Sequence, residues 1–327
     1  MTTWMNALRC GSRYRVVHYT PFKVEGNKLT VRLHSGVLDF GSEYYVTMDE
    51  GFVKGHEGFA KGDIAIKTKP KPSSSSELSV NPDGKSDFCT IQGAVNYSAS
   101  LGKETAVTIN IARGEYPEML FVRDKNNLTF QGRSRSGTVI AYANSENYVN
   151  GSGGSLSSKP SAGREIGKAG GRSVILIESS SNVTFKDLTM KNTFGELKGQ
   201  AEVMYFNNDN GILTIDNCAL HSLQDTFLCK GDVTVTNSLI AGHCDFIWGY
   251  PKKCVFEGCE IRAMAAGYVV QARVNSASDQ GFIFRNAFVN SKYNFMSAYK
   301  TTFTIWGIAA VLFCVSFAVR GLSQSID

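Results

Sequence analysis

The feature that most constrains the fold is a short alternating segment that recurs through residues 127–286. Each copy alternates apolar and polar residues and ends in Gly, Asn or Asp: NLTFQG, NVTFKD, ILTIDN, DVTVTN, KCVFEG and GFIFRN. The steps between copies are 55, 30, 20, 21 and 28 residues when the following positions are taken as equivalent: Leu128, Val183, Leu213, Val233, Cys254 and Phe282. A short step near 20 residues, lengthened in places by loops, is typical of a solenoid in which every coil adds one strand to a parallel sheet.

The same spacing argues against helical folds. A globin-like or doubly wound α/β fold would need amphipathic helices of about ten residues or more between strands, and the short steps leave no room for them. The sequence therefore predicts an all-β fold, a right-handed, single-stranded parallel β-helix. The stretch 145–171, rich in Gly, Ser and Lys, is expected to be a surface loop on one coil.

Composition shifts divide the chain into four regions. Residues 1–68 contain short alternating strands between Gly, Asp and Glu turns (KLTVRLH, EYYVTM, DIAIKT), which predict a small Ig-like β-sandwich or part of one. Residues 69–77, KPKPSSSSE, are a Pro/Ser linker. The β-helix is expected over residues 78–300, and an apolar tail follows over residues 301–327.

Charge and cysteine usage narrow the function classes. The net charge of +5 comes from 34 basic and 29 acidic residues spread along the chain, so we expect no nucleic-acid partner, whereas an acidic polymer is compatible as substrate. Five of the eight cysteines fall within residues 218–259 without a CxxC motif or a histidine cluster. We therefore expect small core residues rather than metal ligands, with disulfides between some of them left open.

The two ends of the chain carry separate signals. The N-terminus lacks the continuous apolar run of a secretory signal peptide, so no export signal is visible. Residues 303–319 are 17 residues without a charge, at the lower limit for crossing a bilayer. A membrane anchor is one interpretation; the favoured one is an altered or truncated terminus that replaces the last coils. The last strand would then have an open edge unless the tail covers it.

Asp225 and Asp245 form the most informative pair of polar residues. If one coil uses about 20 residues, these aspartates occupy equivalent places on neighbouring coils, about 5 Å apart. Two carboxylates at that distance cannot both ionise easily, so one pKa rises and the other stays low. Such a pair can provide an acid together with a nucleophile or base at neutral pH. The alternative is that each Asp merely caps a turn.

Several motifs appear in the order of one known family. NPDGKSDFCTIQGAVNYS, INIARGEYPEMLFV, NNLTFQGRSRSGTVI and KDLTMKNTF lead to the most specific elements, QAEVMYF, LQDTF and DFIWG. On these motifs, residues 81–290 resemble the pectin methylesterase family, carbohydrate esterases built on a right-handed β-helix. The Gly-x-Tyr-x-Glu element at Gly114, Tyr116 and Glu118 is expected to shape a turn rather than to contact substrate.

The resemblance implies a role for each matching residue. Asp245 would be the nucleophile that attacks the methyl-ester carbonyl of a galacturonate unit. Asp225 would protonate the departing methanol and then activate water against the acyl-enzyme. Gln200 and Gln224 would donate side-chain N–H groups to the oxyanion of the tetrahedral intermediate.

Substrate-binding residues and the wider setting follow from the same resemblance. Trp248, Phe246 and Arg273 are the expected substrate-binding residues, with the Trp248 ring either stacked on a sugar or buried between coils. The partner is methyl-esterified pectin, and no metal or organic cofactor is required by this chemistry. We expect a monomer in an extracellular or cell-wall location, with membrane attachment through residues 303–319 as the alternative.

The chain also departs from the family pattern. It lacks the Leu-Gly-Arg-Pro-Trp element whose arginine keeps the nucleophilic carboxylate ionised, and Arg273 in the segment QAR is a candidate replacement. Glu202, in QAEVM, would add a negative charge near the site if it pointed inward. Two other functions therefore stay open: a glycoside hydrolase of pectic polysaccharide that uses paired carboxylates, and a catalytically inactive β-helix that binds polysaccharide.

Overall fold

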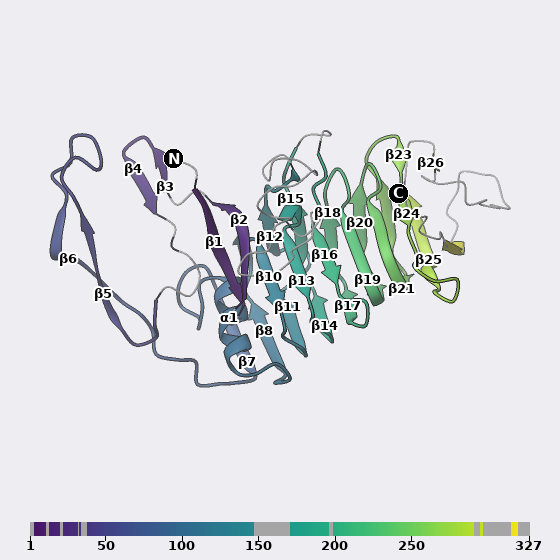
Figure 1. The fold of residues 1–327 in the computed structure, drawn as a ribbon, viewed down its shortest axis with the longest axis horizontal. Coiled ribbons are helices and arrows are strands. Elements are labelled where there is room, and N and C mark those ends of the chain that lie inside the picture. The colour runs from purple at the N-terminus through teal and green to yellow at the C-terminus, as the bar shows by residue number, and fades with distance from the viewer. Residues whose placement is uncertain are drawn as a thin grey trace.

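The computed structural model describes residues 3–10, 13–19, 22–31, 33, 38–146, 171–195, 199–290, 295–296 and 315–319. Its main body is a long parallel β-helix whose coils follow one another from β7 to β25 (Figure 1). The predicted β-helix is therefore confirmed. The described strands of the body lie in three parallel stacks, one for each side of the coil.

The first stack, called here the site stack, is built from strands that pair in parallel from coil to coil. Its members are β10 (Leu120–Arg123), β13 (Ile175–Glu178), β16 (Met204–Asn207), the first half of β19 (Phe227–Thr236), the first half of β21 (Ile247–Glu257) and β24 (Val270–Ala272).

The second stack contains the segments that repeat in the sequence. Its members are β7 (Glu77–Val80), β8 (Val107–Ile111), β11 (Leu128–Gly132), β14 (Val183–Lys186), β17 (Ile212–Asp216), the second halves of β19 and β21, and the first half of β25 (Gly281–Asn290).

The third stack closes each coil. It consists of β9 (Gly114–Tyr116), β12 (Thr138–Tyr142), β15 (Thr189–Asn192), β18 (Ala219–His221), β20 (Leu239–Gly242), β22 (Glu260–Ala263) and the end of β25. A short parallel pair, β23 (Gly267–Tyr268) with β26 (Phe295–Met296), lies beside the last coils.

The register of the second stack matches the equivalences expected from the repeat. Leu128 pairs with Val183, and each later position predicted as equivalent pairs with the next one along, as far as Phe282. Five of the six residues that end the copies take positive φ angles: Asp187, Asn217, Asn237, Gly258 and Asn286. Gly, Asn and Asp are the residues that adopt this left-handed conformation at least cost, which explains why they end the copies.

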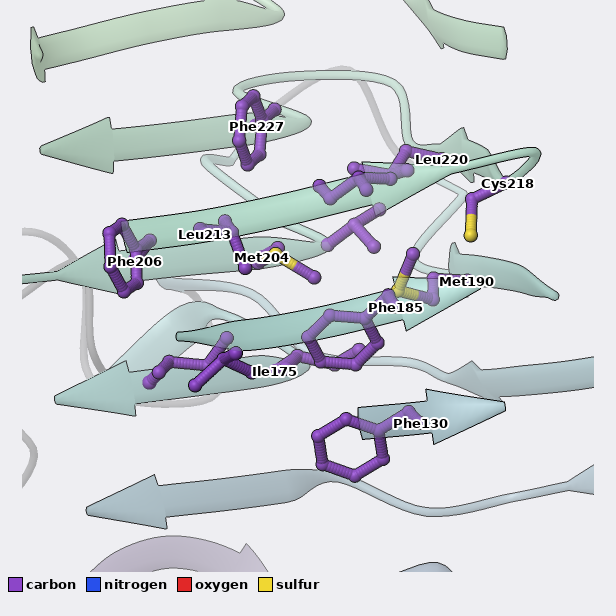
Figure 2. Packing of buried hydrophobic residues seen from close by; sticks show 14 of the residues in the cluster. Phe130, Ile175, Phe185, Met190, Met204, Phe206, Leu213, Cys218, Leu220 and Phe227 are labelled. Carbon is purple, nitrogen blue, oxygen red and sulfur yellow. The ribbon is translucent and has the colours of Figure 1, made fainter. Parts of the chain in front are cut away.

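The core lies inside the coils and is built from side chains stacked along the helix axis. Phe130 and Phe185 are parallel, with ring centroids 4.4 Å apart (Figure 2). Phe256 stacks on Phe284 in the same way, at 4.8 Å. Such ladders arise because equivalent inward positions recur one strand spacing apart. Cysteines at four positions, Cys218, Cys229, Cys254 and Cys259, are buried as free thiols, which confirms their interpretation as small core residues.

Helix α1 (Ile91–Ser100) packs at the β7 and β8 end of the β-helix (Figure 1). Thr90 caps its first turn by accepting from the N–H of Gly93 at 3.1 Å. The Glu118 carboxylate accepts from the N–H groups of Ile91 and Gln92, both at 3.0 Å. The Gly-x-Tyr-x-Glu element therefore has a structural role, as expected from the sequence.

The N-terminal region forms antiparallel strands, but in separate pairs. The described strands are β1 (Thr3–Cys10) with β2 (Arg13–Tyr19), β3 (Phe22–Glu25) with β4 (Lys28–Val31), and β5 (Glu43–Met48) with β6 (Phe59–Lys67). These are three two-stranded sheets, and most side chains of β5 and β6 are exposed. The described strands therefore do not enclose the kind of core that an Ig-like sandwich has.

The C-terminal tail contributes one described strand, β27 (Val315–Val319). It pairs antiparallel with β25, with Phe282 opposite Val319 and Ala287 opposite Val315. This pairing covers part of the edge that the sequence led us to expect as open. Most of the 303–319 segment lies outside the described residues, as does most of the 145–171 loop. Among the described helices, none has the length and apolar character needed to cross a bilayer.

Candidate active site

Three acidic residues occupy the same position on three successive coils of the site stack. Glu202, Asp225 and Asp245 each lie two residues before the start of a strand, namely β16, β19 and β21. Those strands are in register, with Met204 opposite Phe227 and Phe227 opposite Ile247. The stacking expected for Asp225 and Asp245 is therefore present, and Glu202 extends the column by one coil.

Both aspartates lie at a tight turn into the strand. Their φ angles are 60° for Asp225 and 46° for Asp245, in the left-handed region that Asp tolerates better than most residues. The Asp225 N–H donates to the Cys244 carbonyl at 3.0 Å, and Gln224 bridges Cys244 in parallel. The turn therefore fixes the backbone of both aspartates.

Asp245 is half-buried and is held through one carboxylate oxygen. Its Oδ2 accepts from Gln271 Nε2 at 3.2 Å, while its Oδ1 has no hydrogen-bond partner within the described part of the chain. Burial raises the pKa of Asp245 above its ordinary value, and the charge of Arg273 opposes that rise. One oxygen of Asp245 is thus held in place, and the other is buried with its hydrogen-bonding capacity unused in the described structure.

Asp225 is more deeply buried, with 2% of its surface exposed. Its Oδ2 lies 3.7 Å from Arg172 Nη2, and its Oδ1 contacts no donor among the described residues. Burial and then the charge of Glu202 raise the pKa of Asp225 to about 8, against the opposing charge of Arg172. Asp225 is therefore protonated at neutral pH and can act as an acid.

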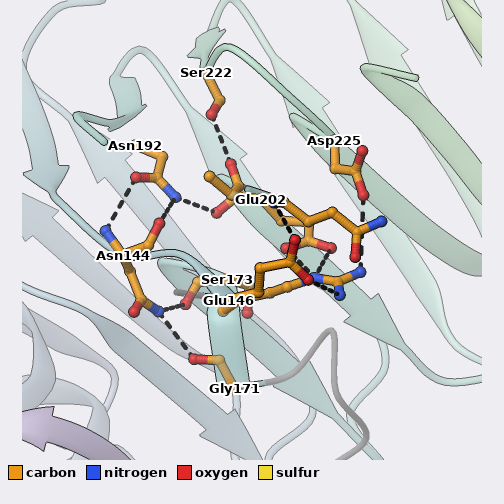
Figure 3. A network of polar contacts seen from close by, with 11 residues as sticks. Asn144, Glu146, Gly171, Ser173, Asn192, Glu202, Ser222 and Asp225 are labelled. Carbon is orange, nitrogen blue, oxygen red and sulfur yellow. Dashed lines mark hydrogen bonds and ion pairs between the residues drawn. The ribbon is translucent and has the colours of Figure 1, made fainter. Parts of the chain in front are cut away.

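Arg172 is the main residue of the site that the sequence analysis missed. Its Nε donates to both carboxylate oxygens of Glu202, at 2.8 and 3.0 Å, and its Nη1 lies 3.8 Å from Glu146 Oε2 (Figure 3). Arg172 follows directly on the loop predicted for residues 145–171 and matches no motif. The sequence nevertheless carried a signal for its place in the fold, namely the apolar run SVILIE that follows Arg172. This run forms β13, which pairs with β16.

Glu202 points into the site, which is the case in which it would add a negative charge there, but this charge is paired. The side chain is fully buried, and the Arg172 guanidinium forms a close ion pair with it. Burial alone would lower the pKa of Arg172, but the charge and hydrogen bonds of Glu202, together with the charges of Asp225 and Glu146, outweigh that effect and raise it. Arg172 is therefore a permanent cation among several carboxylates.

A network of buried amides fixes the backbone on both sides of this ion pair. Asn144 Nδ2 donates to the carbonyls of Gly171 and Ser173, at 2.9 and 3.1 Å, which flank Arg172 (Figure 3). Asn192 Nδ2 donates to the carbonyls of Asn144 and Glu202, at 2.7 and 3.0 Å. The positions of Arg172 and Glu202 are thus set by the same two asparagines.

Trp248 lies next to the carboxylates with both arginines near its ring. The guanidinium carbons of Arg172 and Arg273 are 6.0 and 5.3 Å from the ring centroid, within cation–π range. Only 7% of Trp248 is exposed, so burial between coils accounts for most of its surface. Its Nε1 is buried without a protein acceptor in the described residues.

The glycine after Trp248 is required by close packing. Gly249 has a φ of 127°, and a Cβ built there would lie 2.3 Å from the Cys229 carbonyl oxygen. Any side chain at this position would force the two coils apart. This explains the glycine that ends the DFIWG motif.

Arg273 is placed differently from the cation expected to pair with the nucleophile. Its Nη1 donates to the Tyr250 hydroxyl at 3.4 Å, and it forms no ion pair with Asp245 in the described structure. Its charge still lowers the pKa of Asp245, so it acts on that carboxylate from a distance. It is partly exposed, which leaves it accessible to a ligand.

The remaining predicted residues divide into two kinds. Gln200 and Gln224 are partly exposed at the start of successive coils, and no described residue accepts from their side-chain amides. Gln200 is anchored through its backbone, since its N–H donates to Glu146 Oε1 at 3.2 Å and its carbonyl accepts from the Glu146 N–H. Phe246 corrects our expectation: it is fully buried in the core, so its ring offers no face to a substrate.

Comparisons with known proteins agree on one family. The Pectinesterase family profile matches residues 77–309, which begins at the predicted linker boundary and extends past residue 290. Pectinesterase 31 of Arabidopsis thaliana is 27% identical over 232 residues, covering 70% of this chain and 68% of that protein. The solved structure of pectin methylesterase PemA from Erwinia chrysanthemi has a TM-score of 0.54 at 25% identity, covering 71% of this chain and 74% of that one. A pectin methylesterase in complex with a hexasaccharide has a TM-score of 0.53 at 24% identity, with the same two coverages.

Proposed function

This chain belongs to the pectinesterase family of carboxylic ester hydrolases, and we propose that it releases methanol from the methyl esters of polygalacturonate through Asp245 and Asp225. The observation that carries the proposal is the arrangement of these two carboxylates. They lie in register on successive coils, and each keeps one oxygen without a partner in the described structure. Their surroundings differ, so they are suited to different roles.

Asp245 is suited to be the nucleophile. It is the less buried of the two, Gln271 holds its Oδ2, and the charge of Arg273 favours its ionised form. Its free Oδ1 would attack the C6 carbonyl carbon of a methylated galacturonate unit. The attack converts the ester into a tetrahedral intermediate with a negative charge on the former carbonyl oxygen.

Gln200 and Gln224 would stabilise that oxyanion. Both side-chain amides are partly exposed beside the aspartates and have no acceptor among the described residues. Donors that no other acceptor engages do not have to break a hydrogen bond when the charge develops. These amides also favour ester chemistry over glycoside hydrolysis, in which no carbonyl oxygen becomes charged.

Asp225 would act as the acid and then as the base. Because its pKa is raised to about 8, it carries a proton at neutral pH and can donate it to the methoxy oxygen as the carbon–oxygen bond breaks. Methanol leaves and an anhydride joins Asp245 to the substrate. Asp225, now ionised, removes a proton from water, which attacks the same carbonyl carbon and releases the free galacturonate and Asp245.

The test measures methanol release from highly methylated pectin by the full chain and by Asp225→Asn and Asp245→Asn. Asp232→Asn is the matched control, because Asp232 is exposed at the start of the second half of β19. We expect both site variants to fall at least about 10³-fold and the control to keep full activity. Circular dichroism checks that all four proteins fold.

Two results would refute the proposal. Shortening of the pectin chain without methanol release would identify a glycoside hydrolase on the same fold. A folded parent that binds pectin but releases neither product would identify a polysaccharide-binding protein.

A further inference from the structure

The proposed reaction leaves one buried ion pair without a role, that between Arg172 and Glu202. Both side chains are almost completely buried, and their closest atoms are 2.8 Å apart. An apolar pair of similar volume would stabilise the fold about as well, because desolvation of two charges offsets most of their attraction. The position of the pair is therefore more informative than its contribution to stability.

The guanidinium group of Arg172 is shared unequally among three carboxylates. Its Nε binds both oxygens of Glu202, whereas its Nη2 lies 3.7 Å from Asp225 Oδ2 and its Nη1 lies 3.8 Å from Glu146 Oε2. The first contact is a close, charge-assisted hydrogen bond, and the other two are longer than a hydrogen bond. Glu202 thus draws the cation away from Asp225.

The register of the coils makes this competition direct. Glu202 and Asp225 occupy the same position on adjacent coils, so their carboxylates approach the same guanidinium group from neighbouring strands. The backbone at both ends of the pair is fixed by Asn144 and Asn192. Arg172 therefore has little freedom to move from one acid to the other while Glu202 is ionised.

We propose that Arg172 and Glu202 form a positioning pair for Asp225, in which Glu202 holds the guanidinium group where it orients the Asp225 carboxyl group without forming a close ion pair with it. In this orientation Asp225 Oδ1, which no described donor contacts, would be the oxygen that gives its proton to the substrate. A close ion pair would instead keep Asp225 ionised and remove the proton that the departing methanol needs. This inference rests on the proposed function for its consequence in catalysis, but its structural part can be measured separately.

The charged groups around Asp225 come from four elements. They are Arg172 before β13, Glu202 before β16, Asp245 before β21, and Glu146 after β12. Among these four described residues, Arg172 is the one cation. Removing the charge of Glu202 should therefore release Arg172 mainly to Asp225.

The test uses Glu202→Gln in the full chain, with the pKa of Asp225 followed by carbon-13 NMR of labelled aspartate side chains. Asp225→Asn assigns the signal. We expect the Asp225 pKa to fall by about one unit or more, a tenfold change in its protonation equilibrium. The alkaline limb of methanol release should shift to lower pH by the same amount, with kcat reduced at neutral pH and KM little changed.

Glu178→Gln is the matched control. Glu178 forms another buried ion pair with arginine in the site stack, with Arg123 Nη1 at 2.8 Å, but Glu178 is not among the groups that shift Asp225. The Glu178→Gln variant shows how much the Asp225 pKa changes when a carboxylate–arginine pair is broken elsewhere in the site stack. If Glu202→Gln fails to fold, Glu202→Asp replaces it, since the shorter side chain keeps the charge but loosens its hold on Arg172, and an intermediate fall in the pKa is expected.

The outcomes separate the inference from the proposed function. An unchanged Asp225 pKa in folded Glu202→Gln, or an equal change in Glu178→Gln, would overturn the positioning role. If Glu202→Gln lowers the Asp225 pKa but the unmutated chain releases no methanol, the positioning role is supported and the esterase proposal is refuted.

Discussion

Asp225 and Asp245 hold the same position on successive coils, yet each is bound through a different neighbour. Oδ2 of Asp225 faces the guanidinium group of Arg172 at 3.7 Å, while Oδ2 of Asp245 accepts from the amide of Gln271 at 3.2 Å. Each leaves its Oδ1 without a partner in the described structure. Register alone would make the two carboxylates equivalent, so their neighbours are what suit them to the separate roles proposed above.

Removing an oxyanion donor should lower the rate more than the affinity. We expect Gln224→Ala to reduce kcat for methanol release by about 10²- to 10³-fold with KM changed little, because the amide contacts the substrate oxygen mainly when it is charged. Steady-state kinetics on highly methylated pectin measures this. Gln280→Ala, at an exposed position before β25, is the control. A rise in KM at constant kcat would assign Gln224 to substrate binding instead.

Removing the charge of Arg273 should change the acid side of the pH profile. The positive charge lowers the pKa of Asp245, so Arg273→Gln should raise it. Because the nucleophile must be ionised, the acid limb of the kcat/KM profile should move to higher pH. Arg285→Gln, an exposed arginine on β25, should leave the profile unchanged. An acid limb that stays in place would show that Arg273 does not act on the nucleophile.

Asp225 should make the protein less stable as the pH rises. Its pKa is about 8 in the folded protein against an ordinary value of 3.8, so the folded state holds a proton that the unfolded state has already lost between about pH 4 and 8. The free energy of unfolding therefore falls across this window. Asp225→Asn should make the decline shallower and raise stability at pH 8 by on the order of 2 kcal/mol.

Urea unfolding of the parent and Asp225→Asn at several pH values measures this difference. Glu118, whose pKa is raised to about 7 mainly by burial, contributes a decline of the same sign in both proteins and cancels in the comparison. Parallel stability curves for the two proteins would contradict a raised pKa at Asp225.

The tail should protect the last coil from association. β27 pairs with β25 between Phe282 and Ala287, which occupies backbone groups that would otherwise form a free sheet edge. Deletion of residues 301–327 should therefore increase self-association, measured by light scattering during concentration of the purified protein. Equal scattering from the deleted and full-length chains would show that β27 is not what protects this edge.

Most of the fold could be predicted from the repeat. Inward positions alternate along each strand, and the turn after five of the six copies takes a positive φ that Gly, Asn and Asp adopt most easily. Local conformational preferences therefore specify both the strand and its end. Every predicted equivalence from Leu128 to Phe282 is a strand pair in the structure. The N-terminal region was harder, because alternation predicts strands but not which sheets they join or whether those sheets pack together.

The candidate site could be predicted only in part. The 20-residue interval placed Asp225 above Asp245 because both lie at the same point of one repeat. The expectation for Phe246, which came from the family resemblance, was wrong, since a residue next to a predicted site aspartate can point into the core as easily as out of it. Neither the interval nor the resemblance identified Arg172, which follows a loop of a length that conceals the register of its coil.

The sequence by itself determined the β-helix, its register and the column of aspartates, because these depend on periodicity and on the conformational preferences of single residues. Tertiary structure alone decided the electrostatics of the column. The contacts of Arg172 with Glu202, Asp225 and Glu146 join residues that precede three successive strands of the site stack, and burial sets how strongly each charge acts on the next. Those contacts depend on distances of a few ångströms between side chains far apart in the chain, and no local pattern specifies them.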